Sequence, residues 1–139
     1  MKFFLKSLVA ITLIMPLAAC QTNSKDQILG STESQVKLRE MQTRVYNTTD
    51  NERLLRTIIA TMQDLGFVIE KADKELGSIT ATKLDGYNLK LTATTRPKGK
   101  TQTMVRVNAT YNIETVEDPE PYQRFFTSLE KAQFLENHQ

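Results

Sequence analysis

Residues 49–67 read TDNERLLRTIIATMQDLGF and carry the strongest structural signal of the chain. Thr49 and Glu52 have the spacing of a capping box, in which two side chains satisfy free backbone N–H groups at the start of a helix. Gly66 supplies a C-terminal cap. Between them, apolar residues recur at helical spacing: Leu54, Leu55, Ile58, Ile59, Met62 and Leu65. The pattern predicts an amphipathic helix over about 50–65, with one face on a core.

Alternation of apolar and polar residues predicts strands on both sides of this helix. The strand before the helix spans Leu38–Tyr46, and its alternation leaves open which of its two faces is buried. Four strands follow the helix, separated by turns that contain Gly, Pro or Asp. We expect these strands at 67–70, 78–83, 87–94 and 105–114, with turns at 73–77, 85–86 and 97–100. Ile113 belongs to the apolar face of the last strand.

A second apolar stripe predicts a helix near the end of the chain. Its face comprises Tyr122, Phe125, Phe126, Leu129 and Gln133, and it is closed by Phe134 and Leu135. The segment 117–121 is predicted to be a loop, because its two prolines cannot continue a strand. The element order is then β-α-β-β-β-β-α. This order predicts a single α+β domain over 37–136, with an antiparallel sheet, two helices packed on one face and the other face wet.

Two short motifs add a family resemblance to this order. Asp64-Leu65-Gly66-Phe67 ends the first helix, and Tyr122-Gln123-Arg124-Phe125-Phe126 opens the last. With the order of elements, they resemble small helix-grip domains, such as those of the outer-membrane assembly lipoprotein, and also uncharacterised proteobacterial lipoproteins. The resemblance covers roughly residues 38–135 and implies a helix-grip-like fold.

The first twenty residues carry a separate signal. Lys2 and Lys6 precede an apolar run, Leu8–Leu17, which is too short to span a bilayer comfortably. The sequence Leu17-Ala18-Ala19-Cys20 follows, and Cys20 is the sole cysteine of the chain. This start resembles the signal peptide and lipobox of bacterial lipoproteins. An ordinary signal peptide with a chance cysteine and a signal anchor are the alternatives.

The lipoprotein resemblance implies how the chain is processed and where it resides. Residues 1–19 would be removed as the signal peptide, and Cys20 would carry the lipid. Two or more acyl chains make such an anchor stable. Gln21 in the second mature position implies the outer membrane, facing the periplasm, with the inner membrane as the alternative. The polar residues that follow predict a tether, so 20–36 comprise the lipidated cysteine and a flexible linker.

Charge and cysteine content limit what the mature chain is expected to bind. The chain has 18 Lys and Arg against 16 Asp and Glu, and loss of Lys2 and Lys6 with the signal leaves 16 of each sign. A neutral mature chain does not support general binding of nucleic acid. With Cys20 lipidated, no thiol remains for a disulfide or a metal, so the domain depends on its core for stability.

The search for catalytic chemistry finds no constellation that supports an enzyme. His138 is the only histidine and lies next to the C-terminal residue, so we expect neither a metal site nor a catalytic triad. The carboxylate pairs Asp73–Glu75 and Glu117–Asp118 fall in predicted turns, where solvated charge is the ordinary explanation. We therefore expect a protein without catalytic residues, cofactor or metal.

Two surface features are candidates for contact with a partner. Positive charge gathers around the predicted hairpin at Arg96, Lys98, Lys100 and Arg106, with Lys90 nearby. Such a cluster suits anionic lipid headgroups or an acidic partner, and a charged, soluble hairpin tip is the alternative. The wet face of the sheet is rich in small polar residues: Thr92, Thr94, Asn108, Thr110 and Asn112.

The sequence thus favours a membrane-anchored, periplasm-facing lipoprotein that binds rather than catalyses. Its expected role is a binding or accessory subunit of an envelope complex, in outer-membrane assembly, secretion or transport, with a protein partner in the envelope. The alternative is a carrier of a small apolar ligand or lipid in a cavity between helix and sheet. That cavity would be lined by Met62, Phe67, Tyr87 and Phe126.

The anchor can be tested at Cys20. Cys20→Ser removes the sulfur that would receive the diacylglyceryl group, so we expect unlipidated, unprocessed precursor. Metabolic labelling with palmitate and membrane fractionation measure this, and Thr22→Ser serves as a control that should keep the label. Label retained by Cys20→Ser would contradict the lipoprotein assignment.

Overall fold

A computed structural model describes residues 34–84 and 88–138, and residues 33–139 form a compact unit. The helix predicted at 50–65 is confirmed as α2, Asn51–Asp64. Its N-cap is Asp50 rather than Thr49, because the Asp50 carboxylate accepts a 2.9 Å hydrogen bond from the backbone N–H of Arg53. Gly66 follows the helix with a positive φ of 84°, as the predicted C-terminal stop requires.

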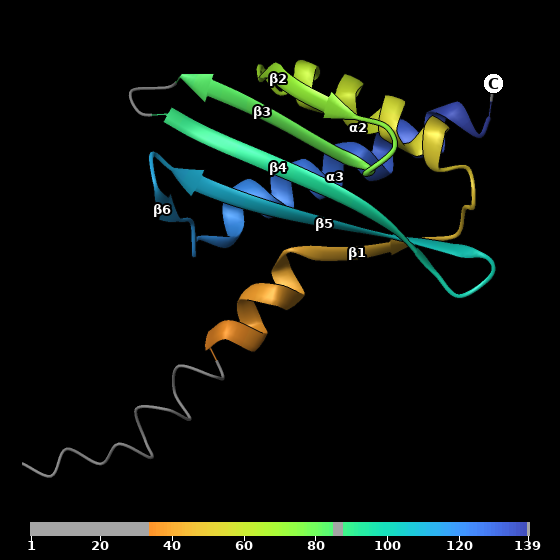
Figure 1. Ribbon diagram of the computed structural model, residues 1–139, viewed down its shortest axis with the longest axis horizontal. Coiled ribbons are helices and arrows are strands. Elements are labelled where there is room, and N and C mark those ends of the chain that lie inside the picture. The colour runs from red at the N-terminus through yellow and green to blue at the C-terminus, as the bar shows by residue number, and fades with distance from the viewer. Residues whose placement is uncertain (1–33, 85–87, 139) are drawn as a thin grey trace, which may run out of the picture. The chain divides into compact units, whose positions relative to one another are not determined.

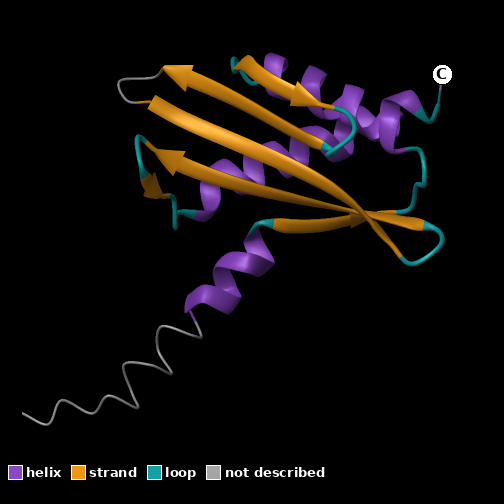
Figure 2. Cartoon of the chain, in the orientation of Figure 1, coloured by secondary structure: helices purple, strands orange, loops and turns teal. Residues whose placement is uncertain are grey.

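Within the described residues the protein is α+β, with one antiparallel sheet of six strands (Figures 1 and 2). The strands are β1 Thr43–Tyr46, β2 Val68–Asp73, β3 Ser78–Leu84, β4 Asn88–Lys98, β5 Gln102–Tyr111 and β6 Glu114–Thr115. Their order across the sheet is β1-β5-β4-β3-β2, and β6 pairs with β5. The predicted strands and their sequence order are therefore broadly confirmed, with β6 added. The predicted turn at 85–86 lies outside the described residues.

One hydrophobic core joins the sheet to α2 and to α3, Pro119–Glu136. α2 packs against α3 and against β2, β3 and β4, and α3 packs against β5. As predicted, the buried residues of β5 alternate along the strand at Val105, Val107 and Ala109. The largest fully buried side chains include Tyr122, Phe125, Phe126, Leu129, Leu54, Ile58 and Met62.

The segment before β1 differs from the prediction. Residues 34–41 form a helix, so the predicted strand at 38–46 is wrong over its first half and begins only at Thr43. Leu38 and Met41, three residues apart, pack against the core from one side of this helix. The last residues of the predicted tether, 34–36, are helical, and the rest of it lies outside the described part of the chain. In β1 itself the core side carries Tyr46, which is buried.

The entry into α3 is also different. The predicted loop at 117–121 ends at Asp118, because both prolines lie in the first turn of α3. Proline is tolerated there, where a backbone N–H has no partner within the helix. Asp118 caps the helix by accepting a 2.9 Å hydrogen bond from the N–H of Glu120. At the other end, Phe134 and Leu135 are exposed, so the prediction that they close the buried face of this helix is wrong.

At the end of β5, two residues do not lie where the sequence predicted. Asn112 adopts a φ of 54°, and the chain turns back there to form β6. Asn112 therefore lies in a turn and not on the wet face of the strand. Ile113 is 94% exposed, where we expected an apolar face. Alternation carried past the end of a strand gives the wrong face, because the turn breaks the two-residue period.

Two glycines provide a matched test of the sheet turns. Gly77 and Gly99 have φ angles of 63° and 65°, so alanine at either position should cost about 1–2 kcal/mol of backbone strain. A Cβ at Gly77 would also lie 2.5 Å from Oγ1 and 2.9 Å from the carbonyl oxygen of Thr95, whereas a Cβ at Gly99 meets nothing within 4 Å. Urea denaturation should show a clearly larger loss for Gly77→Ala than for Gly99→Ala. Equal losses would contradict this packing.

Candidate functional site

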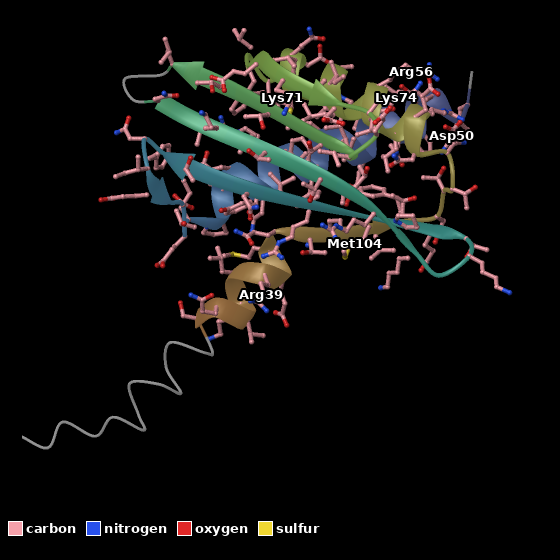
Figure 3. The ribbon with its side chains drawn as sticks, in the orientation of Figure 1. Arg39, Asp50, Arg56, Lys71, Lys74 and Met104 are labelled. Atoms are coloured by element: carbon pink, nitrogen blue, oxygen red, sulfur yellow. The ribbon has the colours of Figure 1, made fainter. Side chains whose placement is uncertain are left out.

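The face of the sheet that points away from the core is here called the open face. Along β3, β4 and β5 the side chains of this face are only partly buried, in alternation with the buried set. It carries the predicted polar residues Thr92, Thr94, Asn108 and Thr110. Figure 3 shows side chains projecting from this side of the strands, with Met104 labelled. These threonine and asparagine side chains are polar, and the sheet holds them in regular rows.

The predicted hairpin cations lie at one end of the open face. Cross-strand pairs place Val45 beside Met104, and Met104 beside Arg96. The next row places Arg106 opposite Thr94. Arg96 and Arg106 are thus diagonal neighbours on adjacent strands, at a typical separation of about 7–8 Å. Arg96, Lys98, Lys100 and Arg106 are called the cationic strip, and the first three are exposed.

Arg106 is the member of the strip with an unusual environment. Its side chain is half-buried, and its Nη2 donates a 3.3 Å hydrogen bond to Oε1 of Gln42. Its buried Nε has no hydrogen-bond partner. Among the ion pairs of the described residues, none includes Arg106. The guanidinium carries five N–H donors, of which one bonds to Gln42 and another, on Nε, is shielded from water without a partner.

Gln42 holds Arg106 in place, and sequence reasoning missed it. Gln42 is buried, and its Nε2 donates a 3.4 Å hydrogen bond to the hydroxyl of Tyr122 in α3. The Tyr122 hydroxyl in turn donates to the carbonyl oxygen of Val116 at 2.6 Å. Gln42 therefore links the open face to the core. Gln42 and Arg106 are brought together by the pairing of β1 with β5. No sequence pattern near Gln42 predicts this contact.

Lys90, which the sequence placed near the cluster, differs from Arg106 because it has a carboxylate partner. Its Nζ forms a 3.4 Å ion pair with Glu70 of β2. Glu70 also accepts a 2.6 Å hydrogen bond from the hydroxyl of Thr82. That hydrogen bond, with a smaller contribution from Lys90, lowers the pKa of Glu70 below its usual value. Lys90 is thus balanced by a carboxylate, and the cationic strip begins beyond it.

A pocket of about 210 Å³ lies on the core side of the sheet and is called the end pocket. Its lining residues are Leu65, Phe67, Lys83, Leu89, Leu91, Tyr111, Glu120, Pro121 and Arg124. Of the residues expected to line a carrier cavity, Phe67 lines this pocket. Met62 and Phe126 are 0% and 2% exposed within the packed core, and Tyr87 lies outside the described residues. Pockets for drug-sized ligands typically reach about 300–1,000 Å³, so this one is small.

Two of the four carboxylates considered for chemistry, and the histidine, make local structural contacts. Asp73 accepts a hydrogen bond from the N–H of Leu76 in the β2–β3 turn, and Asp118 caps α3. The ring of His138 stacks on Phe134, with 4.2 Å between ring centroids. Within 34–84 and 88–138, no three His, Cys, Asp or Glu side chains are grouped so that they could hold a metal.

The sequence features that suggest membrane attachment lie in residues 1–20, at the start of the chain. Cys20 and the predicted signal peptide lie outside the described residues. No helix in the described part of the chain is both long enough and apolar enough to cross a membrane. Comparison with models of known protein families gave no match to this chain, and neither did a search of curated proteins.

Proposed function

We propose that this chain is a membrane-anchored, periplasm-facing lipoprotein that acts as a non-catalytic binding or accessory subunit of an envelope complex. The anchor would be Cys20, behind the lipobox Leu17-Ala18-Ala19-Cys20, and Gln21 favours the outer over the inner membrane. The domain would be helix-grip-like, with α2 and α3 over the core face of the sheet. Outer-membrane assembly, secretion and transport are the candidate processes.

The observation that supports this proposal is that the cationic strip has no acidic neighbour in its own rows of the sheet. Its rows on β1, β4 and β5 contain Arg96, Lys98 and Arg106 but no acidic residue. Val45 and Met104 add an apolar centre between the charges. An acidic partner would find bidentate donors and a small apolar contact in one place. We infer that the strip is the docking surface for such a partner.

Electrostatic docking of this kind has a defined physical signature. Exposed charges steer an oppositely charged partner and are screened over about 8–10 Å at physiological salt. The strip would thus mainly accelerate association, and the short apolar centre would slow dissociation. An anchored domain also needs only modest affinity, because the membrane confines it near its partners.

A carrier function is the second candidate, and the end pocket is the observation that favours it. Since Met62 and Phe126 are packed within the core, a lipid-sized cavity would require the core to open. The end pocket, of about 210 Å³, offers space for a small ligand without such an opening.

Charge reversal in the strip tests the docking surface. Lys98→Glu with Lys100→Glu should weaken recovery of envelope partners, or binding to anionic vesicles, by an acyl-free chain that starts at residue 21. The wild-type signal should fall as salt rises, because screening weakens opposite-charge attraction. Folding should be spared, since exposed substitutions usually change stability by less than about 0.5 kcal/mol.

The control carries the same change of net charge outside the strip. Lys71→Glu with Lys131→Glu alters two exposed lysines, on β2 and on α3, and should leave association unchanged. Equal loss in both double variants would indicate a net-charge effect only. Equal recovery of all three proteins at both salt concentrations would reject the strip as a docking surface.

A further inference from the structure

The end pocket lies at the opposite end of β4 and β5 from the cationic strip. Leu89 and Tyr111 line it and are directly paired across these strands, at the start of β4 and the end of β5. In Figure 1 this is the end at which the arrowheads of β3 and β5 lie. Leu65 follows α2, and Glu120 lies in the first turn of α3, so both helix termini contribute to the wall.

The floor of the pocket is apolar. It is formed by Leu65, Phe67, Leu89, Leu91 and Tyr111. Leu84 and Ile113 lie at the same end of the sheet and are 82% and 94% exposed. The backbone of Asn112, beside Ile113, is hydrogen-bonded to Asn88, which pairs with Leu84. Leu84 alternates with the pocket-lining Lys83 and therefore lies on the open face, so neither exposed residue belongs to the pocket lining.

Among the described residues that line the pocket, three are charged, with an excess of one positive. Arg124 forms an ion pair with Glu120, one turn away in α3. Lys83 has no carboxylate partner among the ion pairs of the described residues, and its Nζ donates a 3.2 Å hydrogen bond to the carbonyl oxygen of Leu65. The ammonium can form three hydrogen bonds, so it retains donors for an anionic group at the rim.

We propose that the end pocket binds a small amphiphile, a short straight alkyl chain that ends in a carboxylate. The chain would lie on the apolar floor, and the carboxylate would accept hydrogen bonds from Lys83. The volume of about 210 Å³ limits the ligand to a short chain. This inference is independent of docking at the cationic strip, which lies on the other face of the sheet.

Chain length tests the apolar floor. The probes are butanoate, hexanoate, octanoate and decanoate, titrated without detergent into the ¹⁵N-labelled chain from residue 21, which contains the whole compact unit 33–139. Affinity should rise about fourfold per methylene until the pocket is full, and then level off. The largest amide shifts should occur around the pocket lining. Octanol is the uncharged comparison and should bind about tenfold more weakly than octanoate.

Substitutions of charged rim residues test whether the ligand is an anion, because removing a negative charge and removing a positive charge should change octanoate affinity in opposite directions. Glu120→Gln removes a negative charge and releases Arg124, so octanoate should bind more tightly. Lys83→Met should weaken octanoate about tenfold, while Lys83→Arg should largely retain binding. Lys71→Met changes an exposed lysine that does not line the pocket, and should leave affinity unchanged. Unchanged or weaker binding in Glu120→Gln would overturn the assignment of an anionic ligand.

A variant in which a large side chain fills the end pocket tests whether octanoate binds there. Leu65→Trp places a large side chain at the lining and should abolish octanoate binding, whereas Leu84→Trp, at an exposed aliphatic residue outside the lining, should not. The amide spectrum of each variant shows directly whether it is folded. Should Leu65→Trp fail to fold, Leu89→Phe replaces it. Absence of saturable binding by every chain length, or equal binding in the filled and control variants, would overturn the proposal.

Discussion

The two faces of the sheet are set by the alternation of side chains in β4 and β5. Leu91 and Ala93 on β4, with Val105 and Val107 on β5, bury one set of side chains against the helices. Full burial of an aliphatic side chain is worth about 1.5–3 kcal/mol, so a slip by one residue would expose this set and bury the polar one. The core therefore forces the arginines of the hairpin onto the open face, where no acid lies in their rows.

The parts of the fold that the sequence predicted are those in which a long periodic pattern coincides with the core. α2 and the buried face of β5 follow directly from such patterns. The errors fall where a local rule competes with the tertiary structure. Residues 34–41 alternate weakly and fold as a helix that Leu38 and Met41 attach to the core, and Pro119 suits the first helical turn as well as a loop.

The candidate site was predictable in composition but not in geometry. The positive charges around the hairpin could be counted from the sequence. Three of them, Arg96, Lys98 and Lys100, are exposed in the structure, as expected of a contact surface. The half-buried state of Arg106 and its bond to Gln42 depend on the pairing of β1 with β5, residues separated by 64 positions. The end pocket likewise requires the exit of α2, the first turn of α3 and three strands to meet, which no single segment encodes.

The distribution of ion pairs separates structural charge from charge available to a ligand. The pairs Lys90–Glu70 and Lys74–Glu52 are solvent-accessible, and such pairs typically contribute about 0–1 kcal/mol. An exposed lysine without a partner is therefore unremarkable, because water solvates it. Arg106 is different, since its Nε is shielded from water and bonded to nothing. A threonine there would avoid that cost and match the neighbouring side chains. Because the Nε itself is shielded, the proposed docking of an acidic group would depend on the terminal N–H groups of the guanidinium.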